Sequence, residues 1–184
     1  MFFFSPNETT IFKPKSVEHA YLAVINNDLE TALKTFENID SPRALWGVAM
    51  VNILNGYLEK YPTYFEIRNF YEIDLDFLLK NEKIEYVENL LGALEILSKI
   101  NHEVFKYTAR VMLVNNLPEI AKKYLDKSRE IFYNDVELHY IYAKYYFDNK
   151  QFNKANFHID ECISFLPDYH PAKVLKKEIA KYLA

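Results

Sequence analysis

Two adjacent stretches of equal length decide the fold of this chain: HEVFKYTARVMLVNNLPEIAKKYLDKSREIFYND at residues 102–135 and VELHYIYAKYYFDNKQFNKANFHIDECISFLPDY at residues 136–169. The two stretches align from end to end without a gap. Small residues fall on small ones and large residues on large ones in five aligned pairs: Ala109 with Ala143, Met112 with Tyr146, Ala121 with Ala155, Leu125 with Ile159, and Ser128 with Cys162. A repeat of about 34 residues is typical of helical repeat proteins.

The spacing of apolar residues explains the repeat in physical terms. Apolar residues recur every three or four positions from Ser16 onward, which predicts amphipathic helices. Two antiparallel helices can approach closely only where small side chains face each other, and larger residues one turn away fill the remaining space. Each helix hairpin still exposes an apolar face that the next hairpin covers, so stacked hairpins are expected.

This pattern resembles the tetratricopeptide repeat (TPR) family. The second stretch has residues of the expected type at seven of that family's positions: Ala143, Tyr146, Phe152, Ala155, Ile159, Cys162 and Pro167. The first stretch keeps the two alanines but has Pro118 where an aromatic residue is usual and Tyr133 where the terminal proline would stand. The resemblance implies a right-handed superhelical solenoid with a concave groove that binds protein segments.

Composition and length support a single all-α domain. Half of the 184 residues are hydrophobic, 15 are Tyr and 14 are Phe, while only three are Gly, which favours long helices with bulky faces over a turn-rich β architecture. We expect an irregular segment at 1–15 and one domain at 16–184 with about ten helices. A weaker repeat is expected at about 13–46 and a capping helix at 171–183.

Within the weaker repeat, Ala20 and Ala32 restore the spacing of the paired small residues, with Leu29 and Phe36 around them. The following stretch predicts helices near Pro42–Tyr57, Pro62–Lys80 and Ile84–Ile100. These three helices do not divide into units of the repeat length, so the phase of the repeat between residues 42 and 100 stays open. Trp46 is expected to pack against the flanking repeats, the alternative being that it projects toward a partner.

Helix starts are marked by proline and by residues that cap helix N-termini. Ser41 precedes a proline, new apolar runs open at Pro62, Pro118 and Pro171, and Asn101 and Asp135 are predicted N-caps.

Charge, cysteine content and hydropathy exclude several classes of protein. A net charge of −4 with both signs interspersed gives no cationic surface for nucleic acid. No run of about 18 apolar residues predicts a membrane-spanning helix. The apolar run Met1–Phe4 has no basic region before it, and Pro6 follows before a longer apolar segment can form, so no export signal is expected. The single cysteine, Cys162, is compatible with a reducing compartment, and we expect a cytoplasmic protein.

The sequence predicts neither an enzyme nor a cofactor or metal site. The five histidines show no metal-ligand spacing, and Gly47, Gly56 and Gly92 lie too far apart to form a phosphate loop. Acidic clusters around Glu72–Asp76 and Glu82–Glu88 are interpreted as solvated helix faces, with paired-carboxylate catalysis or cation binding as the less favoured alternatives. Cys162 occupies a small-residue position of the repeat and is interpreted as a packing thiol.

In the TPR family the first helix of each hairpin lines the groove. Carried over by position, the resemblance implies a partner groove formed by Glu103, Lys106, Tyr107, Arg110, Leu113, Tyr140, Ile141, Lys144 and Phe147, with Val114, Glu137 and Asp148 at further groove positions.

Two interpretations of the charged groove residues remain open. Lys106, Arg110 and Lys144 form a cationic ladder suited to an acidic or C-terminal carboxylate partner. Alternatively, Glu72 and Asp76 stand one repeat length before the first two cations and neutralise them across neighbouring hairpins. The carboxylate clamp that some members of the family use is absent, because Asn is missing at the required positions.

We therefore expect a non-catalytic adaptor or assembly factor that binds another protein or peptide segment. The alternative is a homo-oligomeric structural module whose aromatic helix faces mediate self-association. An enzyme or a nucleic-acid-binding protein is the weakest hypothesis. Phe2, Phe3 and Phe4 are expected to pack over the first helices, or else to plug the groove or contact a neighbour.

Overall fold

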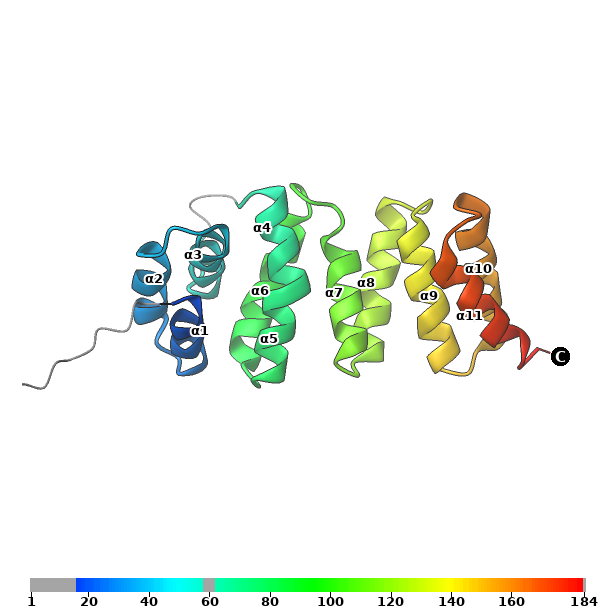
Figure 1. Ribbon diagram of the computed structural model, residues 1–184, viewed down its shortest axis with the longest axis horizontal. Coiled ribbons are helices and arrows are strands. Elements are labelled where there is room, and N and C mark those ends of the chain that lie inside the picture. Colours follow the sequence, from blue (N-terminus) through cyan, green and yellow to red (C-terminus); the bar gives the residue numbers. More distant parts are fainter. Residues whose placement is uncertain (1–15, 58–61, 184) are drawn as a thin grey trace, which may run out of the picture. The chain divides into compact units, whose positions relative to one another are not determined.

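The computed structural model describes residues 16–57 and 62–183, and within these ranges the protein is helical, with no β-strand. The helices are α1 (Val17–Ile25), α2 (Leu29–Glu37), α3 (Pro42–Leu54), α4 (Tyr64–Asn69), the π-helical η1 (Phe70–Asp74), α5 (Leu75–Lys80), α6 (Ile84–Leu97), α7 (Val104–Val114), α8 (Pro118–Ile131), α9 (Val136–Asp148), α10 (Phe152–Phe165) and α11 (His170–Ala180) (Figure 1). Because α4, η1 and α5 are continuous, the described residues contain ten separate helical segments, and the predicted all-α class is confirmed. None of the described helices is long and apolar enough to cross a bilayer.

The described residues divide into two compact units, one within 16–51 and the other within 52–183, each with its own internal packing. In the first unit, α1 and α2 pack against each other as a hairpin, and Ala20 and Ala32 are both fully buried at the predicted small-residue positions. The first fifteen residues lie outside the described residues, and so does the prediction for Phe2–Phe4.

The ring of Phe36 on α2 limits the size of the residue at position 47 of α3, where the two helices meet. A Cβ atom added to Gly47 would lie 2.4 Å from the Phe36 ring, a distance that no side chain tolerates. Phe36 itself is 1% exposed and meets the edge of Tyr21 at 5.3 Å between ring centroids. Trp46, also on α3, is half-buried beside the guanidinium of Arg43.

The second unit is built from helix hairpins that lie side by side. Helix α7 packs on α8, α9 on α10, α5 on α6, and α11 on α10 and α9. The alanines that the repeat predicted at the hairpin contacts are all fully buried: Ala109, Ala121, Ala143 and Ala155. Their small size lets the two helices of each hairpin approach closely, as the sequence pattern required.

The turn inside each hairpin recurs at the repeat length and extends the repeat into the middle of the chain. The C-cap asparagine donates through Nδ2 to the carbonyl four positions earlier, at 2.8, 2.9 and 2.8 Å for Asn81, Asn115 and Asn149. The next residue has left-handed backbone in each case, with φ values of 56°, 58° and 58° for Glu82, Asn116 and Lys150. The α5–α6 turn therefore has the same phase as the α7–α8 and α9–α10 turns.

Large residues hide this third hairpin from sequence comparison. Leu75 and Val87 occupy the positions where the later hairpins have alanine, and both are buried. The helix before the turn also contains η1, whose π turn holds one residue more than an α-helical turn. The wider turn places two successive aromatic residues, Phe70 and Tyr71, in the core, where the Tyr71 hydroxyl donates to the Leu90 carbonyl at 2.6 Å.

Helix starts follow the predicted capping with two corrections. The start predicted at Pro62 lies two residues later, because Thr63 is the N-cap of α4 and accepts from the Glu66 N–H at 3.3 Å. The Asp135 carboxylate accepts from the backbone N–H of Leu138 at 3.0 Å and caps α9, as predicted. The Asn101 prediction was wrong, because α7 begins at Val104 with Glu103 as its N-cap residue. Asn101 instead accepts from the Glu103 N–H at 3.0 Å, in the turn that precedes the helix.

A buried pair of histidines joins α9 to α10, and the sequence pattern did not reveal it. The Nδ1 atoms of His139 and His158 lie 3.1 Å apart, and His139 Nε2 lies 2.9 Å from the Tyr133 carbonyl. Since a carbonyl only accepts, His139 carries its proton on Nε2 and accepts at Nδ1 from His158. Burial, together with the neighbouring His139, lowers the pKa of His158 to about 4, and burial also lowers the pKa of His139.

This pair makes the hairpin sensitive to acid. The unfolded chain binds protons at these histidines below about pH 6.5, whereas folded His158 does so only near pH 4, so stability present above pH 6.5 is lost as the pH falls toward 4. Between pH 7.5 and pH 5, the free energy of unfolding of the wild type is expected to fall by about 2 kcal/mol because of His158. We expect this loss to disappear in His158→Asn, whose side-chain amide keeps a hydrogen-bond donor near Nδ1 of His139. Urea unfolding at both pH values measures the effect, with exposed His102→Asn as the control. An unchanged pH dependence in His158→Asn contradicts it.

Candidate functional site

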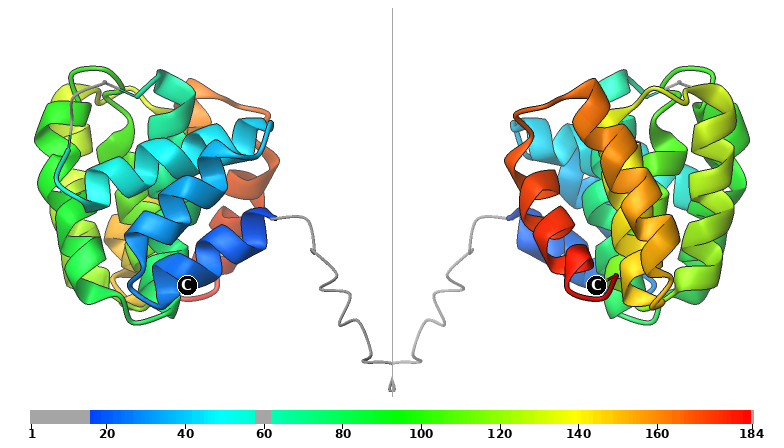
Figure 2. Two further views of the ribbon diagram at one scale, coloured as in Figure 1. Left: turned by 90° about the vertical axis from the view of Figure 1, so that its left-hand side faces the viewer. Right: turned by 90° about the vertical axis from the view of Figure 1, so that its right-hand side faces the viewer.

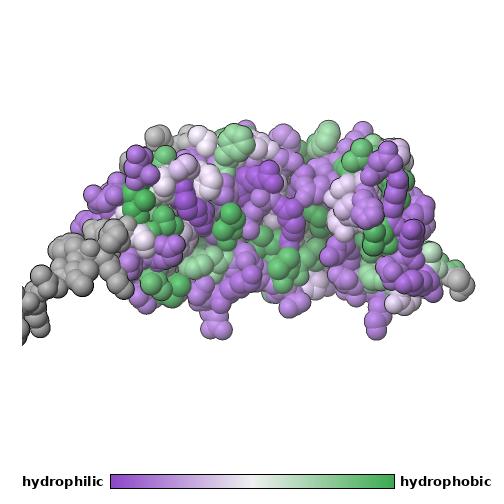
Figure 3. Space-filling model, viewed as in Figure 1, coloured by the Kyte–Doolittle hydropathy of each residue, from purple (hydrophilic) through white to green (hydrophobic). Residues whose placement is uncertain are grey.

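A pocket of about 350 Å³ lies between α7 and α9, the first helices of two successive hairpins. We call it the α7–α9 pocket. Its lining comprises Arg110, Leu113, Val114, Glu137, Tyr140, Ile141, Lys144, Asp148 and Tyr169. In the space-filling view, apolar side chains emerge among polar ones on the face where α7 and α9 lie in front (Figure 3).

Five of the nine residues predicted for the partner groove line this pocket together: Arg110, Leu113, Tyr140, Ile141 and Lys144. The further groove positions Val114, Glu137 and Asp148 line it as well.

Tyr169 is the lining residue that the sequence did not indicate. It follows the second helix of the hairpin, and its ring meets the edge of Tyr140 at 5.5 Å between centroids. Tyr169 is the last residue of the repeat, and the TPR resemblance assigns no groove residue to that position. The sequence therefore gave no reason to expect Tyr169 in the pocket. Together, Tyr140 and Tyr169 form an aromatic wall of the pocket.

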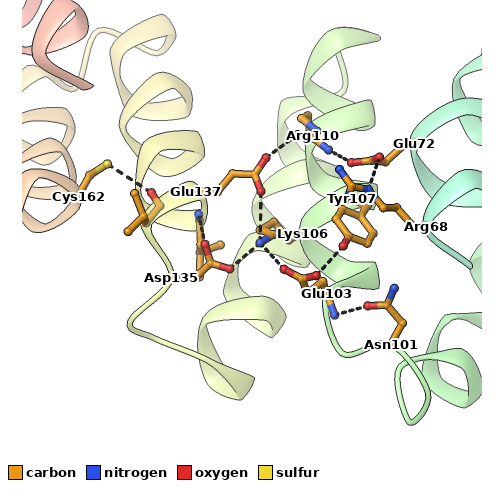
Figure 4. A network of polar contacts seen from close by, with 12 residues as sticks. Arg68, Glu72, Asn101, Glu103, Lys106, Tyr107, Arg110, Asp135, Glu137 and Cys162 are labelled. Carbon is orange, nitrogen blue, oxygen red and sulfur yellow. Dashed lines mark hydrogen bonds and ion pairs between the residues drawn. The ribbon is translucent and has the colours of Figure 1, made fainter. Parts of the chain in front are cut away.

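Lys106 lies outside the pocket, in a buried cluster of charges (Figure 4). Its side chain is 4% exposed, and its ammonium donates to Glu103 at 2.7 Å and to Asp135 at 2.6 Å. A third carboxylate, that of Glu137, lies 3.3 Å away. The predicted role of Lys106 as an open groove cation was therefore wrong, because three carboxylates enclose its charge.

Glu103 is the centre of the same cluster on the side of α4. Its carboxylate accepts from the hydroxyl of Tyr107 at 2.6 Å and from the hydroxyl of Tyr64. Burial alone would raise the pKa of Glu103, but the hydrogen bonds from Lys106, Tyr107 and Tyr64 outweigh burial and hold the pKa at about 2. Glu103, Lys106 and Tyr107 thus satisfy one another instead of facing a ligand.

Arg110 lies between the buried cluster and the pocket. Its guanidinium forms ion pairs with Glu72 and, at 2.5 Å, with Glu137. Glu72 also pairs with Arg68 at 2.8 Å. The neutralisation hypothesis is thus confirmed for Arg110 and Glu72. It is wrong for Asp76, which instead accepts from Lys80 at 2.6 Å and from Asn115 at 2.8 Å.

Lys144 is the cation of the predicted ladder that keeps its charge available. Its side chain is exposed, and within residues 16–57 and 62–183 it forms no ion pair. Phe147, by contrast, does not line the pocket. Its ring packs against Phe152 and Tyr182, at 5.7 Å from each ring centroid.

The pocket combines apolar walls with two cationic side chains, Arg110 and Lys144, and two anionic ones, Glu137 and Asp148. In the described part of the chain no three histidine, cysteine or carboxylate side chains are grouped in a way that could hold a metal ion. Cys162 is fully buried and donates from Sγ to the Val136 carbonyl at 3.3 Å, and burial raises the pKa of its thiol to about 11. The apolar walls and the charged side chains of the pocket could accommodate an amphipathic segment.

Comparisons of the chain with protein-family models, with curated proteins and with solved structures find no significant match.

The buried cluster provides a test of the geometry. We expect Lys106→Met to destabilise the protein by about 3 kcal/mol, because it removes the buried ammonium that the partly buried carboxylates of Glu103 and Asp135 share. Urea unfolding measures the loss, and Lys99→Met, at an exposed position of the same unit, is the matched control. Equal stabilities for the two variants would show that the Lys106 charge is not enclosed.

Proposed function

We propose that this protein is a non-catalytic, TPR-like adaptor that binds a segment of another protein in the α7–α9 pocket. The observation that carries the proposal is the pocket itself, formed by the first helices of two successive hairpins whose sequences repeat without a gap. The repeated Asn81, Asn115 and Asn149 turns support a solenoid of at least three such hairpins. On this proposal the remaining hairpins are the scaffold that holds the pocket.

The aromatic and aliphatic lining supports a role in protein binding. Tyrosine side chains supply rigid apolar area at a low cost in conformational entropy and dominate the binding energy of many interfaces. Tyr140 and Tyr169 stand at one side of the pocket, and Leu113, Val114 and Ile141 complete its apolar part. A volume of about 350 Å³ accommodates one or two apolar side chains of a bound segment.

The charges in the pocket narrow the chemistry of the bound segment. Arg110 already shares two carboxylates, so its attraction for a third is weak. Lys144 has no such partner in the part of the chain that the structure describes, and on this proposal it pairs with an acidic residue that flanks the apolar anchor. The proposed ligand is therefore an extended or helical segment with an apolar anchor and a neighbouring carboxylate.

We expect the double variant Tyr140→Ala, Lys144→Glu to lose partner capture while its unfolding midpoint stays close to that of the wild type. Both side chains are at least partly exposed, and neither belongs to the Lys106 cluster. The measurement is a pull-down with quantitative mass spectrometry, comparing wild type and variant. The matched control is Ile120→Ala, Lys123→Glu on α8, which changes the same classes of residue outside the pocket.

Loss of one partner in the pocket variant alone supports an adaptor that uses the α7–α9 pocket. Equal capture by the wild type and both variants would falsify this binding mode. Loss in both variants to the same degree would mean that binding depends on general surface properties.

Self-association is the second candidate function, and the exposed aromatic residues Phe132 and Phe157 favour it, at 54% and 53% exposure. Light scattering on a concentration series distinguishes it from the adaptor function. A mass that rises with concentration in the wild type and not in Phe132→Ser, Phe157→Ser supports self-association.

We also propose a reducing, cytoplasmic location. The location is supported by the single cysteine, Cys162, which is buried and donates a hydrogen bond to a backbone carbonyl.

A further inference from the structure

Helix α11 has a charge opposite to that of the chain as a whole. Between Pro171 and Leu183 the sequence has four lysines and one glutamate, whereas the whole protein has a net charge of −4. The lysines are Lys173, Lys176, Lys177 and Lys181. Their three- and four-residue spacing gathers them along one side of the helix.

A groove of about 440 Å³ runs between α10 and α11, and we call it the α10–α11 groove. The right-hand view of Figure 2 shows the two helices, orange and red, next to each other. The lining consists of Ile163, His170, Lys173, Val174, Lys176, Lys177 and Ala180. Three lysines of α11 thus line the groove together with the apolar side chains of Ile163, Val174 and Ala180, and no carboxylate takes part in the lining. The groove shares no residue with the α7–α9 pocket.

Two of the groove lysines have partners outside the lining. Lys173 pairs with Asp168 at 2.9 Å, and Lys176 pairs with Asp160 at 2.5 Å. These pairs are substantially exposed, so water screens them and they are easily exchanged. Lys177 is exposed and has no ion pair among the described residues. The groove therefore has a cationic rim with at least one uncompensated charge.

The floor of the groove is apolar and partly open to solvent. Val174 is 48% exposed, and Ile163 on the facing helix is half-buried. The methylene stems of the lysines extend this apolar surface and keep their ammonium groups at the rim. A ligand that fits must bring apolar side chains to the floor and negative charge to the lysines of α11.

We infer that the α10–α11 groove binds an acidic amphipathic helix of a partner protein. An apolar groove between two helices accepts the apolar stripe of a third helix, whose residues recur at three- and four-residue spacing. Glutamates or aspartates beside that stripe meet Lys173, Lys176 and Lys177 at the rim. Charge complementarity of this kind speeds association and excludes basic or neutral helices.

An anionic membrane is the less favoured occupant of the same surface. A bilayer surface is broad and would approach Asp168 and Asp160 together with the lysines, and the Asp168 side chain is 96% exposed. A single helix fits a concave groove and leaves these two carboxylates at its edge. The geometry thus favours a protein segment.

The test uses a synthetic helical peptide of about 18 residues, long enough to form a helix, with a leucine stripe flanked by glutamates. Its control is the same peptide with lysine in place of every glutamate. NMR titration of the full chain follows the amides of α10 and α11, and fluorescence anisotropy gives the affinity. The protein variants are Lys177→Glu in the groove, Val174→Asp on its floor, and Lys99→Glu as the matched control at an exposed site on another part of the same unit.

We expect the acidic peptide to shift resonances around Ile163 and Val174, and Lys177→Glu to weaken its binding about tenfold, because an attraction becomes a repulsion. Val174→Asp weakens binding as well, and Lys99→Glu leaves it unchanged. The inference is overturned if both peptides bind equally, if neither binds, or if the acidic peptide shifts resonances elsewhere. Sedimentation with phosphatidylcholine vesicles containing phosphatidylserine, in the absence of peptide binding, would assign the surface to a membrane instead.

Discussion

The buried ammonium of Lys106 is the constraint on which the arrangement of α7 and α9 depends. An ammonium group removed from water is costly unless carboxylates surround it, and three do so here. One of them, Asp135, also caps the N-terminus of α9, so a single carboxylate starts this helix and holds it against α7. The two helices cannot slide past each other without breaking these contacts. The α7–α9 pocket lies further along the same two helices, so its shape depends on how these contacts fix α7 relative to α9.

The same charges explain why the candidate site is mostly apolar. The guanidinium of Arg110 is paired with the carboxylates of Glu137 and Glu72. Glu103 accepts a hydrogen bond from Tyr107 within the Lys106 cluster. These residues stabilise the contact between hairpins and are not available to a ligand. Lys144, one hairpin further on, has no acidic neighbour that reaches it among the described residues. Among the described residues, the pocket therefore keeps one cation without an ion pair, together with the ring contact of Tyr140 and Tyr169.

The hairpins were predicted correctly where small residues mark the contact between the two helices. Ala109 and Ala143 occupy the predicted close contacts, and Asp135 is the predicted cap. The hairpin of α5 and α6 could not be placed, because its contacts use Leu75 and Val87 and its first helix contains a π turn. There the period survives in the turn, where Asn81 stands one repeat length before Asn115, but not in the small residues at the helix contacts that the comparison relied on.

The sequence by itself determined the helical class and the repeat of the last two hairpins. It did so because helix formation and helix contact depend on residue size and spacing within a short stretch of chain. Only the tertiary structure decided which charges are free, that His139 and His158 meet in the core, and that Tyr169 joins the pocket. Those outcomes depend on distances between side chains of different helices, and the pattern of any one helix does not contain them.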